Sequence, residues 1–232
     1  MSTTTPGVMM VSDEDDKLAD DIGMKIPAQD CILSWDDFKN HVVGKNYIEL
    51  YDISDNEMFI SGMTTKVHLR YSLLNDTVIK RDLSLRIDDT NTCAYVPGLE
   101  ERVDSEKAIF RALSGFTVSP TRMDFVVSSD PSKYLFYFFC YTGDTIMDGR
   151  CSQGLNVLLV EDKRSWPQDG DGVPEGQINL DDIPWGDIER TMIRCFGQQF
   201  LDDTDPQAIW TWRGKECAVP GSDVYNEAVM GT

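Results

Sequence analysis

The two histidines are the residues of this chain best suited to activating a nucleophile. Attack by a serine or a cysteine needs an imidazole nearby to take the proton, and only His41 and His68 are available. The sequence pattern places His41 at the end of a predicted helix and His68 on the polar face of a predicted strand, so we expect both at the surface. No GxSxG motif and no Cys or His pair at zinc-ligand spacing accompanies them. The sequence therefore favours a protein that is not an enzyme, and it predicts no metal and no other cofactor.

Six cysteines are spread along the chain, at Cys31, Cys93, Cys140, Cys151, Cys195 and Cys217. No CxxC occurs among them. The first residues contain an acidic run and no apolar stretch, so they do not resemble a secretory signal. Thiols stay reduced in the compartments that such a chain would occupy. We therefore predict six reduced thiols and a cytoplasmic or nuclear protein, and no apolar run approaches the roughly 20 residues that would predict a membrane span.

An acidic stretch rich in glycine and proline covers residues 169–182. When Gly176 is aligned with the central glycine of a calcium-binding loop, Val173 falls at a ligand position and Pro174 stiffens the loop. A solvated acidic loop is therefore favoured over a calcium site, although the sequence leaves the question of calcium open.

Trp210 and Trp212 lie two positions apart in a predicted strand, and alternation places both on one face. Two indoles side by side can bind a sugar, a peptide or a cation, although burial is the commoner role of large aromatic residues. We take Trp210 and Trp212 as the candidate binding residues. Together with acids from 161–187 they support an alternative function, a carboxylate-based hydrolase or a carbohydrate-binding domain with a Trp-lined cleft.

The charge of the chain is concentrated at its ends. The sequence has 40 acidic and 21 basic residues, a net charge of −19; residues 1–40 carry 9 acids and 3 bases, and residues 161–232 carry 15 and 6. Such a chain repels phosphate, so direct nucleic-acid binding is disfavoured. Acidic flanks increase the association rate with a basic partner. We therefore predict a non-enzymatic intracellular protein-interaction module, or a subunit of a complex, whose acidic flanks engage a protein with a basic surface.

Alternating polar and apolar residues predict an antiparallel hairpin over 65–74 and 78–87 with one exposed face. A second hairpin is predicted over 123–127 and 134–141. Further short strands are predicted at 47–53, 58–61, 93–96, 155–160 and 209–212.

Apolar residues at intervals of three or four predict helices over 35–43, 103–113 and 185–199, the first capped by Ser34. These elements predict an α+β fold with a mainly antiparallel sheet of about 7–8 strands and three helices. The alternative is a β-sandwich with appended helices. The predicted organisation is an acidic flexible tail (1–30), an α+β core (31–160), a Gly/Pro-rich acidic loop (161–183), and a helix with a C-terminal segment packed on the core (184–232).

Overall fold

The computed structural model describes residues 24–53, 64–114, 122–141, 146–147, 149–151, 153–197, 208–212 and 214–231. The helices in these ranges are η1 (Gln29–Cys31), α1 (Trp35–His41), η3 (Leu180–Asp182), α2 (Trp185–Phe196) and α3 (Asp223–Met230). The strands are β1 (Met24–Lys25), β2 (Asn46–Ile53), β3 (Thr64–Leu73), β4 (Val78–Ile87), β5 (Thr92–Arg102), β6 (Ile109–Ser114), β7 (Met123–Val127), β8 (Tyr134–Cys140), β9 (Ile146–Met147), β10 (Arg150–Cys151), β11 (Gly154–Glu161) and β12 (Ala208–Trp210). The predicted strand 58–61 and most of the predicted tail lie outside the described residues, and the predicted division of the chain stays a prediction.

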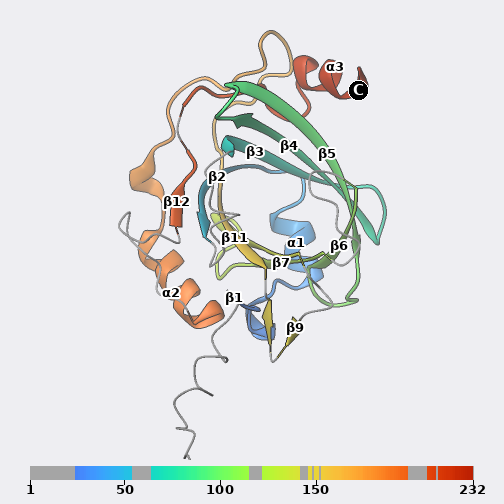
Figure 1. Cartoon of the computed structure of the whole chain (residues 1–232), viewed down its shortest axis with the longest axis vertical. Helices are drawn as coiled ribbons and strands as arrows, with labels where there is room; N and C mark the ends of the chain where they lie inside the picture. Colours follow the sequence, from blue (N-terminus) through green and yellow to red (C-terminus); the bar gives the residue numbers. More distant parts are fainter. Residues whose placement is uncertain are drawn as a thin grey trace, which may run out of the picture.

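The main sheet closes on itself to form an antiparallel barrel. Its strands follow the order β2-β3-β4-β5-β6-β7-β8-β11, and β11 pairs back with β2 from Tyr47 to Ile53. β12 adds to the other edge of β2, with Trp210 opposite Tyr51. Figure 1 shows the ring of strands. The predicted α+β class with a mainly antiparallel sheet is confirmed, whereas the β-sandwich alternative is wrong, because the first and last strands of the ring pair instead of forming two stacked layers.

Helix α1 fills one end of the barrel. It begins where Ser34 Oγ accepts a hydrogen bond from the backbone N–H of Asp37 (3.0 Å), as the sequence predicts. Trp35, Phe38 and Val42 are buried and pack among side chains that point inward from the strands. In Figure 1 the helix lies within the outline of the ring. The barrel is therefore closed by apolar side chains at this end, and we call the opposite end the mouth.

Helix α2 covers the outer face of the barrel. Its buried residues Ile188, Met192 and Phe196 repeat every four positions and form one cluster with outward-facing residues of β2, β8 and β11. It ends at Gly197, which adopts a left-handed conformation (φ 69°) suited to glycine. The predicted helix is thus confirmed, with an earlier end.

The first predicted hairpin is confirmed as β3 and β4, but its exposed face is not. Residues on both faces of these strands are buried. The outer face is covered by the segment around Trp166 and by the C-terminal segment, which contact His68 of β3. These covering segments lie about 80 or more residues after the end of the hairpin, so alternation within the hairpin could not reveal them.

The predicted helix over 103–113 is wrong. Residues 109–114 form β6, in which Phe110 and Ala112 are buried and Arg111 and Leu113 are exposed. This short apolar pattern is compatible with a helix and with a strand. The segment forms a strand because it pairs with β5 on one side and β7 on the other. The sequence pattern did not predict helix α3, which begins after Ser222, whose side chain accepts a hydrogen bond from the backbone N–H of Tyr225.

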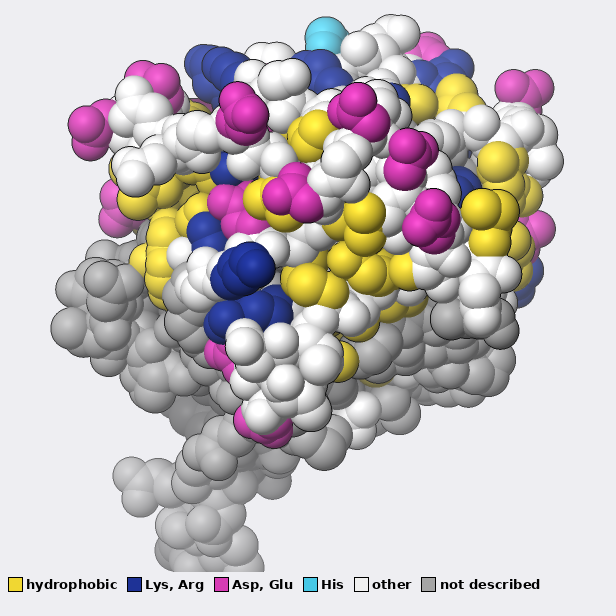
Figure 2. Space-filling view, turned by 90° about the horizontal axis from the view of Figure 1, so that it is seen from above, with side chains coloured by type: hydrophobic (Ala, Val, Ile, Leu, Met, Phe, Trp, Pro, Cys, Tyr) yellow, Lys and Arg dark blue, Asp and Glu magenta, His cyan; other side chains and the backbone are white. Residues whose placement is uncertain are grey.

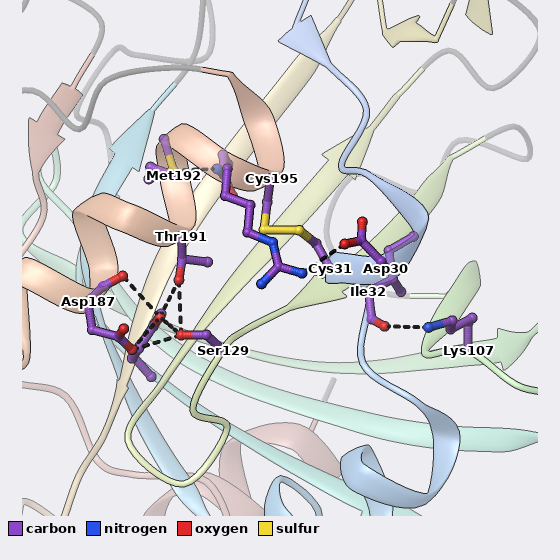
Figure 3. The surroundings of a disulfide bond; sticks show 12 residues. Asp30, Cys31, Ile32, Lys107, Ser129, Asp187, Thr191, Met192 and Cys195 are labelled. Carbon is purple, nitrogen blue, oxygen red and sulfur yellow. Dashed lines mark hydrogen bonds and ion pairs between the residues drawn. A yellow bond between two sulfur atoms is a disulfide. The ribbon is translucent and has the colours of Figure 1, made fainter.

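All six cysteines form disulfides: Cys31–Cys195, Cys93–Cys217 and Cys140–Cys151. The prediction of six reduced thiols is therefore wrong, because spacing along the chain does not report proximity in the fold. Figure 3 shows Cys31 joined to Cys195 of α2, with Asp30 close to the disulfide. Asp30 forms an ion pair with Arg194 (2.8 Å). Structural disulfides are typical of oxidising compartments. The prediction of a cytoplasmic or nuclear protein is wrong for this reason.

Among the described residues, the helices are too short or too polar for any of them to cross a membrane.

Candidate ligand-binding site

Charged side chains from strands on opposite sides of the ring meet inside the barrel, in the space that we call the lumen. Arg81 lies on β4 and Tyr137 on β8, and these strands are separated by three others in each direction around the ring. The guanidinium carbon of Arg81 nevertheless lies 5.2 Å from the centroid of the Tyr137 ring. Contact across the ring places both side chains in the lumen.

Two arginines and two carboxylates form a buried network beside Tyr137 in the lumen. We call these four residues, Arg81, Glu100, Arg122 and Asp124, the arginine–carboxylate network. Arg81 Nε lies 2.8 Å from Glu100 Oε1, and the Arg122 guanidinium lies 2.6 Å from Asp124 Oδ2. Tyr137 Oη donates to Glu100 and, at 3.4 Å, to Asp124. The charges balance, as burial of ions requires. Burial still raises the pKa of Asp124 to about 6, against the opposing effect of Arg122.

Apolar side chains lie on the mouth side of this network. Leu83 follows Arg81 by two positions, Phe139 follows Tyr137 by two, and Leu155 is opposite Phe139. All three are only partly buried, in contrast to the fully enclosed residues around α1. The lumen is therefore filled by apolar side chains at the α1 end, crossed by charges at mid-height, and lined by partly exposed apolar groups towards the mouth.

Two further acids point into the lumen from β2, Glu49 and Asp52. Residues three apart in a regular strand face opposite sides. Here Tyr51 is opposite Leu158 while Glu49 is opposite Leu159, so Leu50 is an extra residue in a β-bulge. Glu49 and Asp52 consequently lie opposite Leu159 and Val157, which belong to the same buried cluster as Phe38 of α1 inside the barrel.

Glu49 is one of the buried polar groups of the lumen that keep an atom without a hydrogen-bond partner, as Tyr71 does through its hydroxyl. The Glu49 side chain is 7% exposed, and its Oε1 makes no hydrogen bond to any atom of the described part of the chain. Burial, with the charge of Asp52 as the next cause, raises the pKa of Glu49 well above its usual range; Arg81 opposes this shift. Sequence reasoning missed this residue, and the available signal was that Glu49 and Asp52 are acids within a predicted strand whose other residues are apolar.

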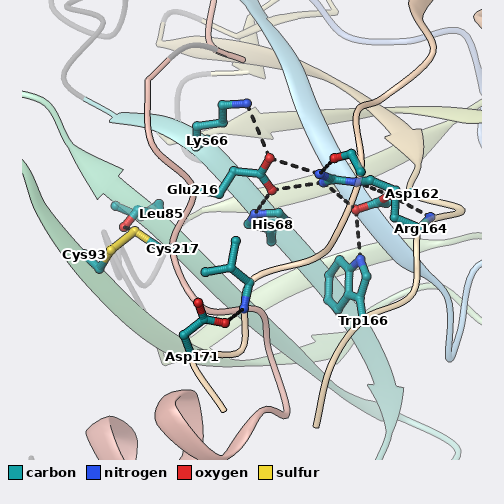
Figure 4. Close-up of polar contacts among 12 residues, drawn as sticks. Lys66, His68, Leu85, Cys93, Asp162, Arg164, Trp166, Asp171, Glu216 and Cys217 are labelled. Carbon is teal, nitrogen blue, oxygen red and sulfur yellow. Dashed lines mark hydrogen bonds and ion pairs between the residues drawn. A yellow bond between two sulfur atoms is a disulfide. The ribbon is translucent and has the colours of Figure 1, made fainter. Parts of the chain in front are cut away.

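A second polar cluster lies outside the barrel around His68 (Figure 4). His68 is fully buried between the rings of Trp166 and Trp212, at 5.5 and 5.3 Å, so its predicted surface position is wrong. Its Nε2 lies 3.3 Å from Glu216, which also pairs with Arg164 at 2.9 Å. Burial lowers the pKa of His68, and these partners hold the pKa of Glu216 at about 2. Through the contacts of Glu216 with His68 and Arg164, the C-terminal segment packs against the outside of the barrel.

The predicted binding residues Trp210 and Trp212 both lie on this outer face. Trp210 packs against Tyr51 with ring centroids 5.0 Å apart, and Lys66 Nζ lies 3.8 Å from the Trp212 centroid. The ring of Trp212 thus already contacts a cation of the protein. A ligand-binding role for these two residues stays a prediction.

An external pocket of about 300 Å³ lies between the end of β11 and η3. Lys133, Asp162, Asn179 and Ile183 are among its lining residues, a mixture of both charges. In the part of the chain that the structure describes, which includes 169–182, no three His, Cys, Asp or Glu side chains are grouped for a metal ion. Asp171 instead accepts a hydrogen bond from the backbone of Val173 (3.1 Å).

The face of the molecule in Figure 2 shows acidic side chains scattered among basic and hydrophobic ones. The net charge of the chain therefore does not form a continuous acidic surface on this face.

No family model and no curated protein matches the sequence. Among solved structures, the chain is similar to the siderocalin Ex-FABP, described as having dual ligand specificities (TM-score 0.48, 13% identity, covering 76% of this chain and 94% of that one). It is also similar to the tryptamine complex of the amine-binding protein of Rhodnius prolixus (0.48, 14%, 77% and 85%) and to cholesterol-bound Japanin of Rhipicephalus appendiculatus (0.44, 14%, 76% and 97%). At these identities and TM-scores the likeness does not extend to function, so the site must be argued from this chain's own residues.

The prediction of an intracellular interaction module with a basic protein partner is wrong. The three disulfides contradict the intracellular location that this prediction assumed. The acidic flanks were its other support, yet the lumen of the closed barrel holds Glu49, a buried carboxyl with one oxygen that has no partner in the described chain.

Proposed function

We propose that this protein is an extracellular carrier that binds one small molecule in the lumen, on the mouth side of the arginine–carboxylate network. Closed barrels of eight strands have an interior just wide enough for side chains or for one small ligand, as in lipocalins. The observation that carries the proposal is Glu49, a buried lumen carboxyl with an oxygen that lacks a hydrogen-bond partner in the described chain. Buried polar groups without partners are rare in folded proteins, and a ligand can supply the missing partner.

The partly exposed side chains of Leu83, Phe139 and Leu155 support the same proposal. Binding sites for small molecules combine apolar walls with a few polar groups that fix orientation. The three disulfides support the extracellular setting.

The test is binding of N-phenylnaphthylamine, a neutral dye that fluoresces in apolar surroundings, to protein produced in an oxidising compartment. Val96 is opposite Leu83 on β5 and therefore faces the lumen. Val96→Trp is expected to abolish dye binding by filling the lumen, whereas Arg111→Trp, on an exposed residue of the outer face, is expected to preserve it. Absence of dye binding by the unmodified protein, or equal binding by both variants, would contradict a lumen site.

A further inference from the structure

We propose that the lumen selects a small organic cation and that Glu49 and Asp52 of β2 hold its ammonium group. This inference rests on the proposed function, because it names the ligand class of the same site. The two acids face one side of β2 only because of the bulge at Leu50. They form the part of the lumen wall in which an acid still has an oxygen without a partner in the described chain.

The cations already present do not serve Glu49. Arg81 faces it from β4, but Arg81 is 2.8 Å from Glu100 and belongs to the balanced network. Asp52 on its own strand and Thr211 after β12 also act on Glu49, each through a side-chain hydrogen bond, and neither carries positive charge. A cationic ligand supplies positive charge beside Glu49, whereas an anionic ligand meets two acids and a neutral ligand brings no charge to Glu49.

The remainder of the ligand must be apolar. Leu83, Phe139 and Leu155 supply partly exposed apolar surface on the mouth side. A primary ammonium group joined by a short chain to an aromatic ring combines both requirements, a charged end for the two acids and an apolar body for these side chains.

Binding of such a ligand releases a proton. Burial and Asp52 raise the pKa of Glu49. In the free protein its carboxyl therefore stays protonated at pH values at which a solvated glutamate is ionised. A bound ammonium favours the carboxylate, and the proton passes to solvent as the cation enters. The site therefore exchanges one positive charge for another, and the affinity for the amine increases with pH until Glu49 is ionised in the free protein.

The experiment compares three probes of similar size: phenethylamine, phenethyl alcohol and hydrocinnamate. Each is measured by displacement of N-phenylnaphthylamine and by titration calorimetry in phosphate and in Tris, whose different ionisation enthalpies report the protons released. We expect the amine to bind about 10- to 100-fold more tightly than the alcohol, as a charge-assisted hydrogen bond provides, with release of up to one proton. Hydrocinnamate is expected to bind most weakly.

Glu49→Gln is expected to remove the preference for the amine and the proton release, while binding of the alcohol is retained. Glu106→Gln removes a carboxylate from an exposed turn and is expected to change neither. If Glu49→Gln does not fold, Asp52→Asn serves as the second variant, and a reduced preference is expected.

Equal binding of amine and alcohol, or a preference that survives Glu49→Gln, would overturn the inference, and dye binding would then still support a lumen site. Failure of the dye and all three probes to bind would instead reject the proposed function itself. Calcium chloride that displaces the amine and releases the same proton would overturn the assignment to an organic cation.

Discussion

Glu49 should make the stability of this protein fall as the pH rises. Its folded-state pKa is raised by burial and by Asp52, above the value of 4.5 taken for the unfolded chain. Between these two pKa values the folded state binds more protons than the unfolded state, so the free energy of unfolding falls with increasing pH. The contribution of this one carboxyl is about 1.4 kcal/mol per pH unit.

Glu49→Gln isolates that contribution, because glutamine resembles the protonated carboxyl and does not titrate. Urea unfolding of the variant and the unmodified protein, from pH 4.5 upwards, gives the difference in their free energies of unfolding. We expect this difference to grow in favour of the variant by about 1.4 kcal/mol per pH unit, and then to stay constant above the folded-state pKa. The matched variant Glu106→Gln, at an exposed position, should show a small difference that does not vary with pH.

A difference between Glu49→Gln and the unmodified protein that is independent of pH would refute this reasoning, because it would mean that Glu49 is solvated or already paired. A variant that is less stable at every pH would refute it equally.

Three other perturbations test the remaining layers of the structure. Replacing Cys93 and Cys217 by alanine opens a link between residues 124 positions apart and is expected to reduce the free energy of unfolding by about 2–5 kcal/mol; an unchanged melting temperature would contradict a structural role. Tyr137→Phe removes a donor to two buried carboxylates of the arginine–carboxylate network and is expected to cost about 1–3 kcal/mol in urea unfolding, so an equally stable variant would argue against a closed network. Acidification below pH 6.5 should lower the free energy of unfolding through the polar cluster around His68. The pKa of His68 is lower in the folded state than in the unfolded state, so the unfolded state binds the proton at a higher pH. His68→Gln should show a weaker dependence of melting temperature on pH between 6.5 and 4.5, whereas Glu216 contributes only as the pH falls from 4.5 towards 2.

Local elements could be read from the sequence where local interactions decide them. The cap at Ser34, the β3–β4 hairpin and the four-residue repeat of α2 all depend on neighbours in the chain, and all three are present. The segment 103–113 was mispredicted because its apolar residues suit two periods, and only the flanking strands decide between them.

The candidate site depended on contacts that no local pattern contains. Pairing of β11 with β2, more than a hundred residues earlier, creates the lumen and makes inward positions distinct from outward ones. The disulfides join cysteines separated by as many as 164 positions.

The sequence by itself determined where most strands and two of the helices begin, because capping, turn residues and alternation act over a few positions. Only the tertiary structure decided that Glu49 and Asp52 face the same interior. Their spacing of three would place them on opposite faces of a regular strand, and the bulge at Leu50, which arises where β2 pairs with β11, turns both inward.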